Sequence, residues 1–396
     1  NIGWEKLRIT KNKCYGCAVC TDVCPQKCIT MSYDKYGFYI PIINDDKCIH
    51  CGKCMKVCPA NNSVQGIEID QIFKGYANDI MSEENQKSTS GAIFALIAKA
   101  IIDSNGVVFG VSFDKEFKNV SHVACFEMTQ VDSCRGSKYI QSRTQGVYKQ
   151  VDEQLKQGKI VLFSGTPCQI AALKSYLKVV PDNLFTVDFV CHGVGSTKFY
   201  QDYLKSVTKD ACISHVGFRD KCGFYLKSTF RIIDSDNTPI TEHLSYEKNF
   251  GKAFANNMIS RESCGECKYA TVERVADISL ADNILFVTEK EKQYGSSLVF
   301  INTQKGLDLF ELIKPNACME QLNKVDVIPK IMHLKHPSIP HKHRKKLLNA
   351  LAKGNYEKAV GYISGYEPKS TIYGRLKRKI KRVKRRIKKF LGKFFD

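Results

Sequence analysis

The pattern of apolar and polar positions along the chain changes near residue 72. Before that point, residues 31–43 (MSYDKYGFYIPII) alternate aromatic and polar side chains around Tyr36 and Gly37. Such an alternation, broken by a glycine, predicts a β-hairpin. Residues 61–71 (NNSVQGIEIDQ) are polar enough to form a linker.

From residue 72 onward, segments with strand and helix patterns alternate. Apolar residues with helical spacing after a Ser/Thr start and before Asn105-Gly106 predict a helix within residues 87–106. The expected elements that follow are strands at 106–113, 122–128, 159–164 and 184–190, and helices at 144–157, 170–178 and 199–207. This alternation predicts an α/β core whose ligands bind at loops that follow strand C-termini.

An antiparallel region interrupts this core. Residues 216–233 have a hairpin pattern, and strands at 277–286 and 297–303 with a helix at 305–313 then complete the core. We therefore expect a small α+β domain in residues 1–65, an α/β core in 72–330, a helical extension in 331–368 and a tail in 369–396.

Composition narrows the class of protein. The 396 residues are 43% hydrophobic and 25% charged, as in soluble globular proteins, and no run of about 18 apolar residues predicts a membrane-spanning helix. The start, NIGWEKLRIT, lacks the apolar segment of a secretory signal, so we expect a cytoplasmic protein. In that compartment, 18 cysteines favour metal ligation over disulfides.

Most of the net charge of +20 belongs to the tail. Residues 369–396 hold 13 Lys or Arg against Asp396 alone, and their apolar residues recur at helical steps from Ile372 to Phe394. A basic amphipathic helix predicts binding to an anionic membrane surface, so the protein is expected to be peripheral to the membrane. Nucleic acid is the second interpretation, ahead of a partner protein or a solvated tail.

The strongest chemical signal is a pair of cysteine runs before residue 60. Each run reads C-x2-C-x2-C-x3-C-P and resembles bacterial ferredoxins that hold two 4Fe-4S clusters. In that arrangement the fourth cysteine of each run ligates the other cluster. The expected sets are Cys14, Cys17, Cys20 with Cys58, and Cys48, Cys51, Cys54 with Cys24. Structural zinc and a disulfide framework are the alternatives, and Cys28, outside the pattern, is expected to be a packed thiol.

Four more cysteines lie in loops of the core. Cys168 (GTPCQ) and Cys191 (VCHG) each follow a predicted strand, and Cys264 and Cys267 (SCGEC) have C-x2-C spacing. Two interpretations remain open from spacing alone: a third 4Fe-4S cluster, or a catalytic or packed cysteine at each position.

Several motifs in order resemble the coenzyme F420 hydrogenase/dehydrogenase beta subunit family. They are CRGSKYIQS, SGTPCQIAAL, DFVCHGVGS, FRDK, SCGECKYA and ADISLAD, within residues 1–310. The resemblance implies FAD and iron-sulfur clusters, with electrons passing between a flavin and a deazaflavin or another acceptor. It favours the third cluster, held by the four core cysteines. Many bacterial relatives lie beside functions in polysaccharide synthesis.

The resemblance also implies a flavin site formed by STSG, RGSKY, GTPCQ and CHG. Ser90 and Gly91 would open a helix whose free amides meet a pyrophosphate, and Arg135 with Lys138 would neutralise it. Ordinary helix caps, surface cations and core aromatics are the alternatives. The expected cofactor-binding residues are Ser90, Gly91, Arg135, Gly136, Ser137, Lys138, Tyr139, Gly165, Thr166 and Gln169.

Three further positions carry expectations about catalysis. His192 is a candidate proton donor because imidazole titrates near neutral pH, although it can equally bond a cluster sulfur or the backbone. Asp220 and Lys221 are expected in a solvated turn. Ala281 stands where the family usually has glycine, and no Trp-Gly follows Asn283, so coenzyme F420 itself is not assumed.

Together these features predict an iron-sulfur flavoprotein oxidoreductase. Electrons from a reduced carrier, such as a ferredoxin or a deazaflavin, would pass through 4Fe-4S clusters and FAD to an organic acceptor. The alternative is an electron-transfer adaptor subunit without a substrate of its own.

Overall fold

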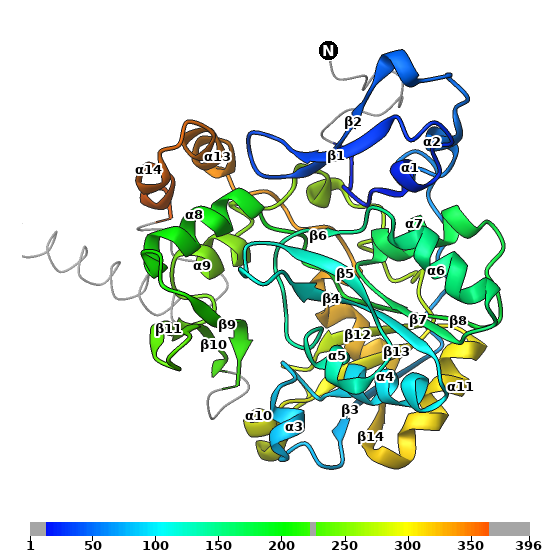
Figure 1. Cartoon of the computed structure of the whole chain (residues 1–396). Helices are drawn as coiled ribbons and strands as arrows, with labels where there is room; N and C mark the ends of the chain where they lie inside the picture. The colour runs from blue at the N-terminus through cyan, green and yellow to red at the C-terminus, as the bar shows by residue number, and fades with distance from the viewer. Residues whose placement is uncertain (1–12, 222–226, 364–396) are drawn as a thin grey trace, which may run out of the picture.

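The computed structural model describes residues 13–221 and 227–363. Its N-terminal unit consists of a two-stranded hairpin and two short helices (Figure 1): β1 Ile29–Tyr33, β2 Tyr39–Ile43, α1 Val19–Asp22 and α2 Lys53–Lys56. The strands pair from Ile29–Ile43 to Tyr33–Tyr39 and turn at Gly37, whose φ of +80° favours glycine. The predicted hairpin is confirmed.

The core is built on a mixed sheet in which the described residues supply nine strands, in the order β14-β3-β13-β12-β8-β7-β4-β5-β6. The middle strands β12, β8, β7 and β4 run parallel, and antiparallel strands flank them. The alternating pattern therefore correctly predicted an α/β core. The strands are β3 Gln71–Ala77, β4 Val107–Phe113, β5 Val120–Cys125, β6 Ser142–Arg143, β7 Val161–Ser164, β8 Leu184–Phe189, β12 Ile278–Asp282, β13 Ser297–Ile301 and β14 Ala317–Leu322.

Helices cover both faces of this sheet, because successive strand residues point to opposite sides. On one face, α4 and α11 pack on Val108 and Leu162, and on the other α6 and α7 pack on Val107 and Phe163. Tyr15, Val19 and Val57 of the N-terminal unit join this second cluster, so the unit rests on the α6 and α7 side (Figure 1). The helices are α4 Ile93–Asp103, α6 Val147–Lys156, α7 Pro167–Leu177 and α11 Gln304–Ile313, with shorter helices α3 Glu83–Gln86, α5 Met128–Asp132, α10 Glu289–Tyr294 and α12 Lys324–Val327.

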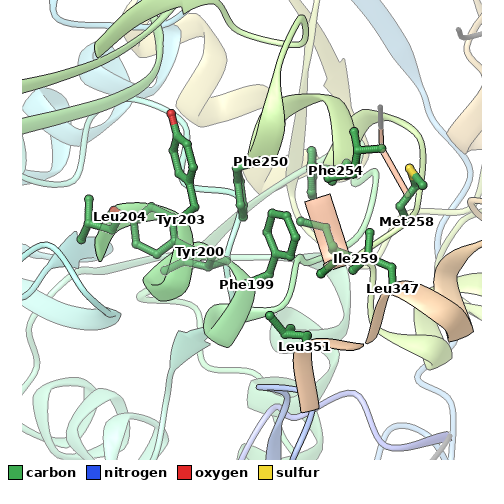
Figure 2. Packing of buried hydrophobic residues seen from close by; sticks show 14 of the residues in the cluster. Phe199, Tyr200, Tyr203, Leu204, Phe250, Phe254, Met258, Ile259, Leu347 and Leu351 are labelled. Atoms are coloured by element: carbon green, nitrogen blue, oxygen red, sulfur yellow. The ribbon is translucent and has the colours of Figure 1, made fainter. Parts of the chain in front are cut away.

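The predicted antiparallel insertion has one strand more than the hairpin pattern indicated. Strands β9 Ile213–Asp220, β10 Thr229–Asp234 and β11 Pro239–Leu244 form a three-stranded sheet. This sheet packs on an aromatic core that also buries residues of α8, α9 and the C-terminal helices (Figure 2). These helices are α8 Thr197–Thr208, α9 Asn249–Ala255, α13 Arg344–Ala352 and α14 Tyr356–Gly361.

Residues 369–396 lie outside the described residues, so the basic amphipathic helix and its membrane contact stay predictions, as do the domain boundaries. Among the helices of residues 13–221 and 227–363, none combines the length and the apolar character needed to cross a membrane.

Candidate iron-sulfur and cofactor sites

The cysteines of the N-terminal unit surround two separate cavities. The larger has a volume of about 260 Å³ and is lined by Cys24, Cys48, Cys51 and Cys54. The smaller, of about 30 Å³, is lined by Cys14, Cys17, Cys20 and Cys58. Each cavity is thus lined by three cysteines of one run and the fourth cysteine of the other; Cys28 also lines the larger cavity, and Cys54 lines both. We call the smaller one the first cavity and the larger one the second cavity.

The donors around these cavities fit 4Fe-4S clusters. Thiolates are the ligands of such clusters, and each binds a different iron, so the four sulfurs stand around a space. Within the described residues, no three His, Cys, Asp or Glu side chains lie close enough together to hold one metal ion. The second cavity reaches the surface at Cys51, which is exposed, whereas Cys17 in the first cavity is buried.

The four core cysteines come from three loops on one side of the sheet. Cys168 is the second residue of α7, directly after β7, and Cys191 follows the neighbouring parallel strand β8. Cys264 and Cys267 lie in and directly after the 3-10 turn Glu262–Glu266. The carboxyl ends of parallel strands lie at the same edge of a sheet. This is why ligands were predicted to bind at the loops that follow these strands.

These four thiols lie close enough to influence one another. Burial raises the pKa of the Cys191 thiol well above its usual range, and the thiols of Cys264, Cys168 and Cys267 raise it further. A Cβ on Gly193 would lie 3.4 Å from the Cys264 sulfur. Gly193 has a φ of +123°, so this position requires glycine both for its conformation and for the close approach. We call these four cysteines the core cysteine site.

The core cysteine site adjoins the first cavity. The Cys168 thiol contributes to the raised pKa of Cys17. Tyr148 donates a hydrogen bond of 2.8 Å to the carbonyl oxygen of Cys17. The buried Arg261 guanidinium donates to the carbonyl oxygens of Cys14 and Tyr39, at 3.0 and 2.6 Å. The N-terminal unit is therefore fixed to the core at the point where the two sets of cysteines meet.

The loop that carries Cys168 is held by a buried polar network. Thr166 caps α7 in a reciprocal capping box with Gln169, whose amide also donates to Ser142 at 2.9 Å. His122 bonds Ser142 and the Ser164 carbonyl, and its burial lowers its pKa to about 4. The structure therefore shows the predicted cofactor residues Thr166 and Gln169 in helix capping. Gly165 packs tightly against this network, since a Cβ there would meet Gln169 at 3.1 Å.

Both ring nitrogens of His192 have partners within the protein. Nε2 donates to the carbonyl oxygen of Phe254 at 3.2 Å, so Nδ1 accepts from Nε2 of His333 at 3.0 Å. Ser338 donates to the carbonyl oxygen of His192 at 2.6 Å. These contacts connect the CHG loop to residues 333–338. The imidazole ring of His192 thereby helps to position the loop. The role of proton donor remains a prediction.

The start of α4 differs from the expected arrangement. The helix begins at Ile93, and the Gly91 amide, expected to be free for a phosphate, donates to Ser297 Oγ at 3.0 Å. The hydroxyls of Ser90 and Ser297 lie 2.8 Å apart. These bonds fix Ser90 and Gly91 to strand β13. Strand β3 also approaches closely, since a Cβ on Gly91 would lie 2.3 Å from the Gly75 carbonyl oxygen.

The RGSKY segment lies beside this helix start. The buried Arg135 guanidinium donates to Ser88 at 2.9 Å and pairs with Asp132 at 3.2 Å. Ser137 donates its amide to Thr89 at 3.0 Å, and Gly136 has a φ of +79°. Lys138 donates to the Arg135 carbonyl at 2.9 Å, and burial lowers its pKa to about 8. The segment is folded back on residues 85–89.

Tyr139 begins a ladder of aromatic rings that leads to the core cysteine site. Its ring stacks on Phe254 with centroids 4.4 Å apart, and Phe254 lies 5.0 Å from the His192 ring. At the other end, the hydroxyls of Tyr139 and Tyr246 are 2.7 Å apart. The ring of Phe254 therefore lies between Tyr139 of the RGSKY segment and His192, which is next to Cys191.

A further cation, Lys221, lies beside Ser90. Lys221 was expected in a solvated turn, but its ammonium donates to the Ser90 carbonyl at 2.6 Å. Burial, together with the charges of Arg135 and Arg219, lowers its pKa to about 7. Arg219 pairs with Asp282 at the end of β12. The FRDK motif was the available signal: it supplies Arg219 and Lys221, and Arg135 from a distant segment lies close to them.

Comparisons with known proteins agree with the N-terminal and core assignments. Residues 13–62 and 40–89 match two family models described as 4Fe-4S dicluster domain, and residues 158–326 match the model for the C terminus of the coenzyme F420 hydrogenase/dehydrogenase beta subunit. A search of curated proteins gave no match. The fold is similar to a chain of the F420-reducing [NiFe] hydrogenase complex from Methanosarcina barkeri, with a TM-score of 0.45 and 17% identity over 74% of this chain and 91% of that chain.

The resemblance seen in the motifs is thereby confirmed. The chain carries an N-terminal 4Fe-4S dicluster domain followed, over residues 158–326, by the C-terminal domain of the oxidoreductase-type coenzyme F420 hydrogenase/dehydrogenase beta subunit family.

Proposed function

We propose that this protein is a flavin-dependent iron-sulfur oxidoreductase that passes electrons from a reduced carrier to an organic acceptor. The observation that carries the proposal is the convergence of Cys168, Cys191, Cys264 and Cys267 beside Cys17 of the first cavity. Four partly buried thiols beside a cluster domain fit a third 4Fe-4S cluster. The link to polysaccharide synthesis, and a ferredoxin or deazaflavin as carrier, rest on the family resemblance.

The cysteine sites lie in an order that suits electron transfer. The second cavity is open at Cys51, the first cavity shares Cys54 with it, and the core cysteine site follows beside Cys17. Bound clusters would supply one-electron transfer, and FAD would convert it to two-electron chemistry with the acceptor. The chain's own contribution is to bring the sites together and to keep the cysteines of the inner ones less exposed than Cys51.

The residues beside Ser90 fit the anionic part of FAD. Lys221 lies close to Arg219 and Arg135; burial is the largest cause of its lowered pKa, and repulsion from these two like charges lowers the pKa as well. A pyrophosphate would relieve this repulsion and accept charge-assisted hydrogen bonds. Tyr139 and the ladder through Phe254 lie between this place and the core cysteine site. We therefore assign FAD to Ser90, Gly91, Arg135, Gly136, Ser137, Lys138 and Tyr139, with Gly165, Thr166 and Gln169 supporting the adjacent loop.

One observation favours the second candidate, an adaptor subunit without a substrate. His192 is the acid-base candidate of the CHG loop, and both of its ring nitrogens are bonded to protein groups. An adaptor needs no proton donor, because it only relays electrons to a partner enzyme.

Iron and flavin analysis tests the proposal. Full-length protein reconstituted anaerobically should hold about twelve irons and one flavin, and Cys191→Ser should hold about eight irons because a cubane needs all four thiolates. Cys212→Ser is the matched control, since Cys212 is an exposed free cysteine, and it should keep about twelve irons. About eight irons in the unmodified protein would exclude the third cluster. Clusters without flavin would overturn the enzyme and favour the adaptor.

A further inference from the structure

A fifth cysteine faces the second cavity. Cys28 lies outside the C-x2-C-x2-C-x3-C pattern, and its burial, at 5% exposed, agrees with the expected packed thiol. It nevertheless lines the same cavity as Cys24, Cys48, Cys51 and Cys54. Its sulfur lies 3.4 Å from the Cys24 sulfur, a distance at which one thiol can donate a hydrogen bond to the other. Five sulfurs therefore surround a space that a 4Fe-4S cluster needs only four to fill.

The backbone holds Cys28 in this position. The chain turns between the two cysteines, where the Lys27 amide donates to the Cys24 carbonyl at 3.1 Å and Lys27 has a φ of +48°. The Asn44 amide donates to the Cys28 carbonyl at 2.8 Å, directly before strand β1. Cys28 packs with Ile29 and Ile43. The sulfur is thus directed at Cys24 by a tight turn and by the hairpin.

The second cysteine run supplies an internal comparison. Cys28 follows Cys24 by four positions, and the residue four positions after Cys58 is Asn62. The Asn62 amide group donates to the carbonyl oxygens of Met55 and Lys56, at 2.9 and 3.2 Å. Asn62 does not line the first cavity. The additional cysteine of the first cavity is Cys54, an expected ligand of the second cluster, whereas the additional cysteine of the second cavity is Cys28, which belongs to neither expected ligand set.

We propose that Cys28 acts on the second cluster in two ways, as a hydrogen-bond donor and as a replacement ligand. In the intact protein Cys28 donates its S–H to the sulfur of Cys24, and when Cys24 is lost Cys28 takes its place as ligand. In that replacement the Cys28 thiol gives its proton to water, and its sulfur binds the iron that Cys24 no longer holds; no electron is transferred. The inference rests on the dicluster assignment, and it is independent of the flavin and of the acceptor.

A hydrogen bond to a ligand sulfur has a known direction of effect. It withdraws negative charge from the sulfur and so favours the reduced form of a cluster, which raises the reduction potential. Because Asn62 gives Cys58 no such donor, the two clusters should have different potentials although their ligand runs have the same spacing.

The first test is an anaerobic redox titration of the full-length protein followed by electron paramagnetic resonance. Cys28→Ala should shift the potential of one cluster to a more negative value and leave the other unchanged, whereas Cys28→Ser, which keeps a donor, should stay near the unmodified value. Asn62→Ala is the matched control and should shift neither. Identical potentials in the unmodified protein and Cys28→Ala would overturn the hydrogen bond.

The second test counts iron in ligand variants. Cys24→Ala should keep the iron content of the unmodified protein, because Cys28 can bind in its place, and Cys24→Ala with Cys28→Ala should lose about four irons. Cys58→Ala should lose about four irons by itself, because the other thiols of the first cavity are all expected cluster ligands. If Cys24→Ala loses as much iron as the double variant, Cys28 is not a replacement ligand. The iron of the first cluster, retained in the double variant, shows that the domain has folded.

Discussion

The N-terminal unit and the core obtain their cysteines from the chain in different ways. Each N-terminal cavity takes three cysteines from a run of seven residues, and left-handed residues such as Gly16 and Gly52 shape the runs locally. The core cysteine site draws on loops spread over residues 168–267 and depends on the sheet to bring them together. We infer that the first kind of site fails locally, and that the second fails when the fold around it is weakened.

The first prediction breaks the core by removing a buried charge. Arg274 pairs with Asp188 at 2.9 Å, and both side chains are almost completely buried. Arg274→Met leaves the Asp188 carboxylate without its partner at the end of β8, shortly before Cys191. We expect a loss of about 3–5 kcal/mol in the free energy of unfolding, measured anaerobically in urea.

The control for this prediction is an ion pair on the surface of the same core. Lys99 and Asp103 pair at 2.8 Å on α4, and both are more than half exposed. Lys99→Ala should change the free energy of unfolding by about 0.5 kcal/mol or less, because exposed pairs are solvated and screened. The comparison fails if the Arg274 and Lys99 variants are equally stable.

Sequence alone identified sites that are built from neighbouring residues better than sites that are built from residues far apart in the chain. The eight N-terminal cysteines were grouped by spacing, since their geometry is set within short runs. The core elements followed from periodicity, and the loops after β7 and β8 followed from the parallel order. Lys221 was misplaced because its position depends on a contact with Ser90, 131 residues away in the chain. No local pattern contains that information.

The amide of Gly91 is a second example of a contact that the sequence could not predict. The position of Gly91 before a helix correctly indicated a helix start, but the bond from its amide to Ser297 spans 206 residues. The ring partners of His192 likewise come from α9 and from residue 333. Periodicity predicts which residues are buried, whereas the partners of buried polar groups depend on the tertiary fold.

The second prediction concerns the contact between the N-terminal unit and the core, which we call the seam. The Arg261 guanidinium donates to Cys14, Tyr39 and Gln141, at 3.0, 2.6 and 3.2 Å. Arg261→Met removes these bonds and leaves buried acceptors without a donor, at a cost of about 1.5–3 kcal/mol. Because the bonds join the N-terminal unit to the core, hydrogen exchange should accelerate in residues 13–43 more than in β7 and β8.

Arg261→Lys separates charge from geometry in the same experiment. Lysine keeps the positive charge but lacks the planar fork that serves several acceptors at once. Its exchange rates should therefore fall between those of the unmodified protein and Arg261→Met. Uniform acceleration over the whole sheet in Arg261→Met would show that the residue stabilises the core in general and not the seam.

The third prediction concerns charge, and its effect is the smallest. The pKa of Lys221 in the free protein is lowered to about 7 by burial and by Arg135 and Arg219. A bound pyrophosphate would favour the protonated form, so FAD binding takes up a proton above this pKa. The dissociation constant should be constant below about pH 7 and rise by up to about tenfold per pH unit above it, equivalent to about 1.4 kcal/mol. Equilibrium titration with FAD between pH 6 and 9 measures this profile.

Two comparisons assign the profile to the contact between Lys221 and phosphate. Riboflavin has the same ring system without phosphates, so its binding should not depend on pH in this range. Lys221→Met should bind FAD more weakly at low pH and lose the slope, because no ammonium remains to be protonated. A slope that persists in Lys221→Met, or that riboflavin shares, would move the phosphate site away from Ser90. The three cations would then only pack the core. Of the core sites that distant segments build, the core cysteine site alone would remain to contrast with the N-terminal cavities.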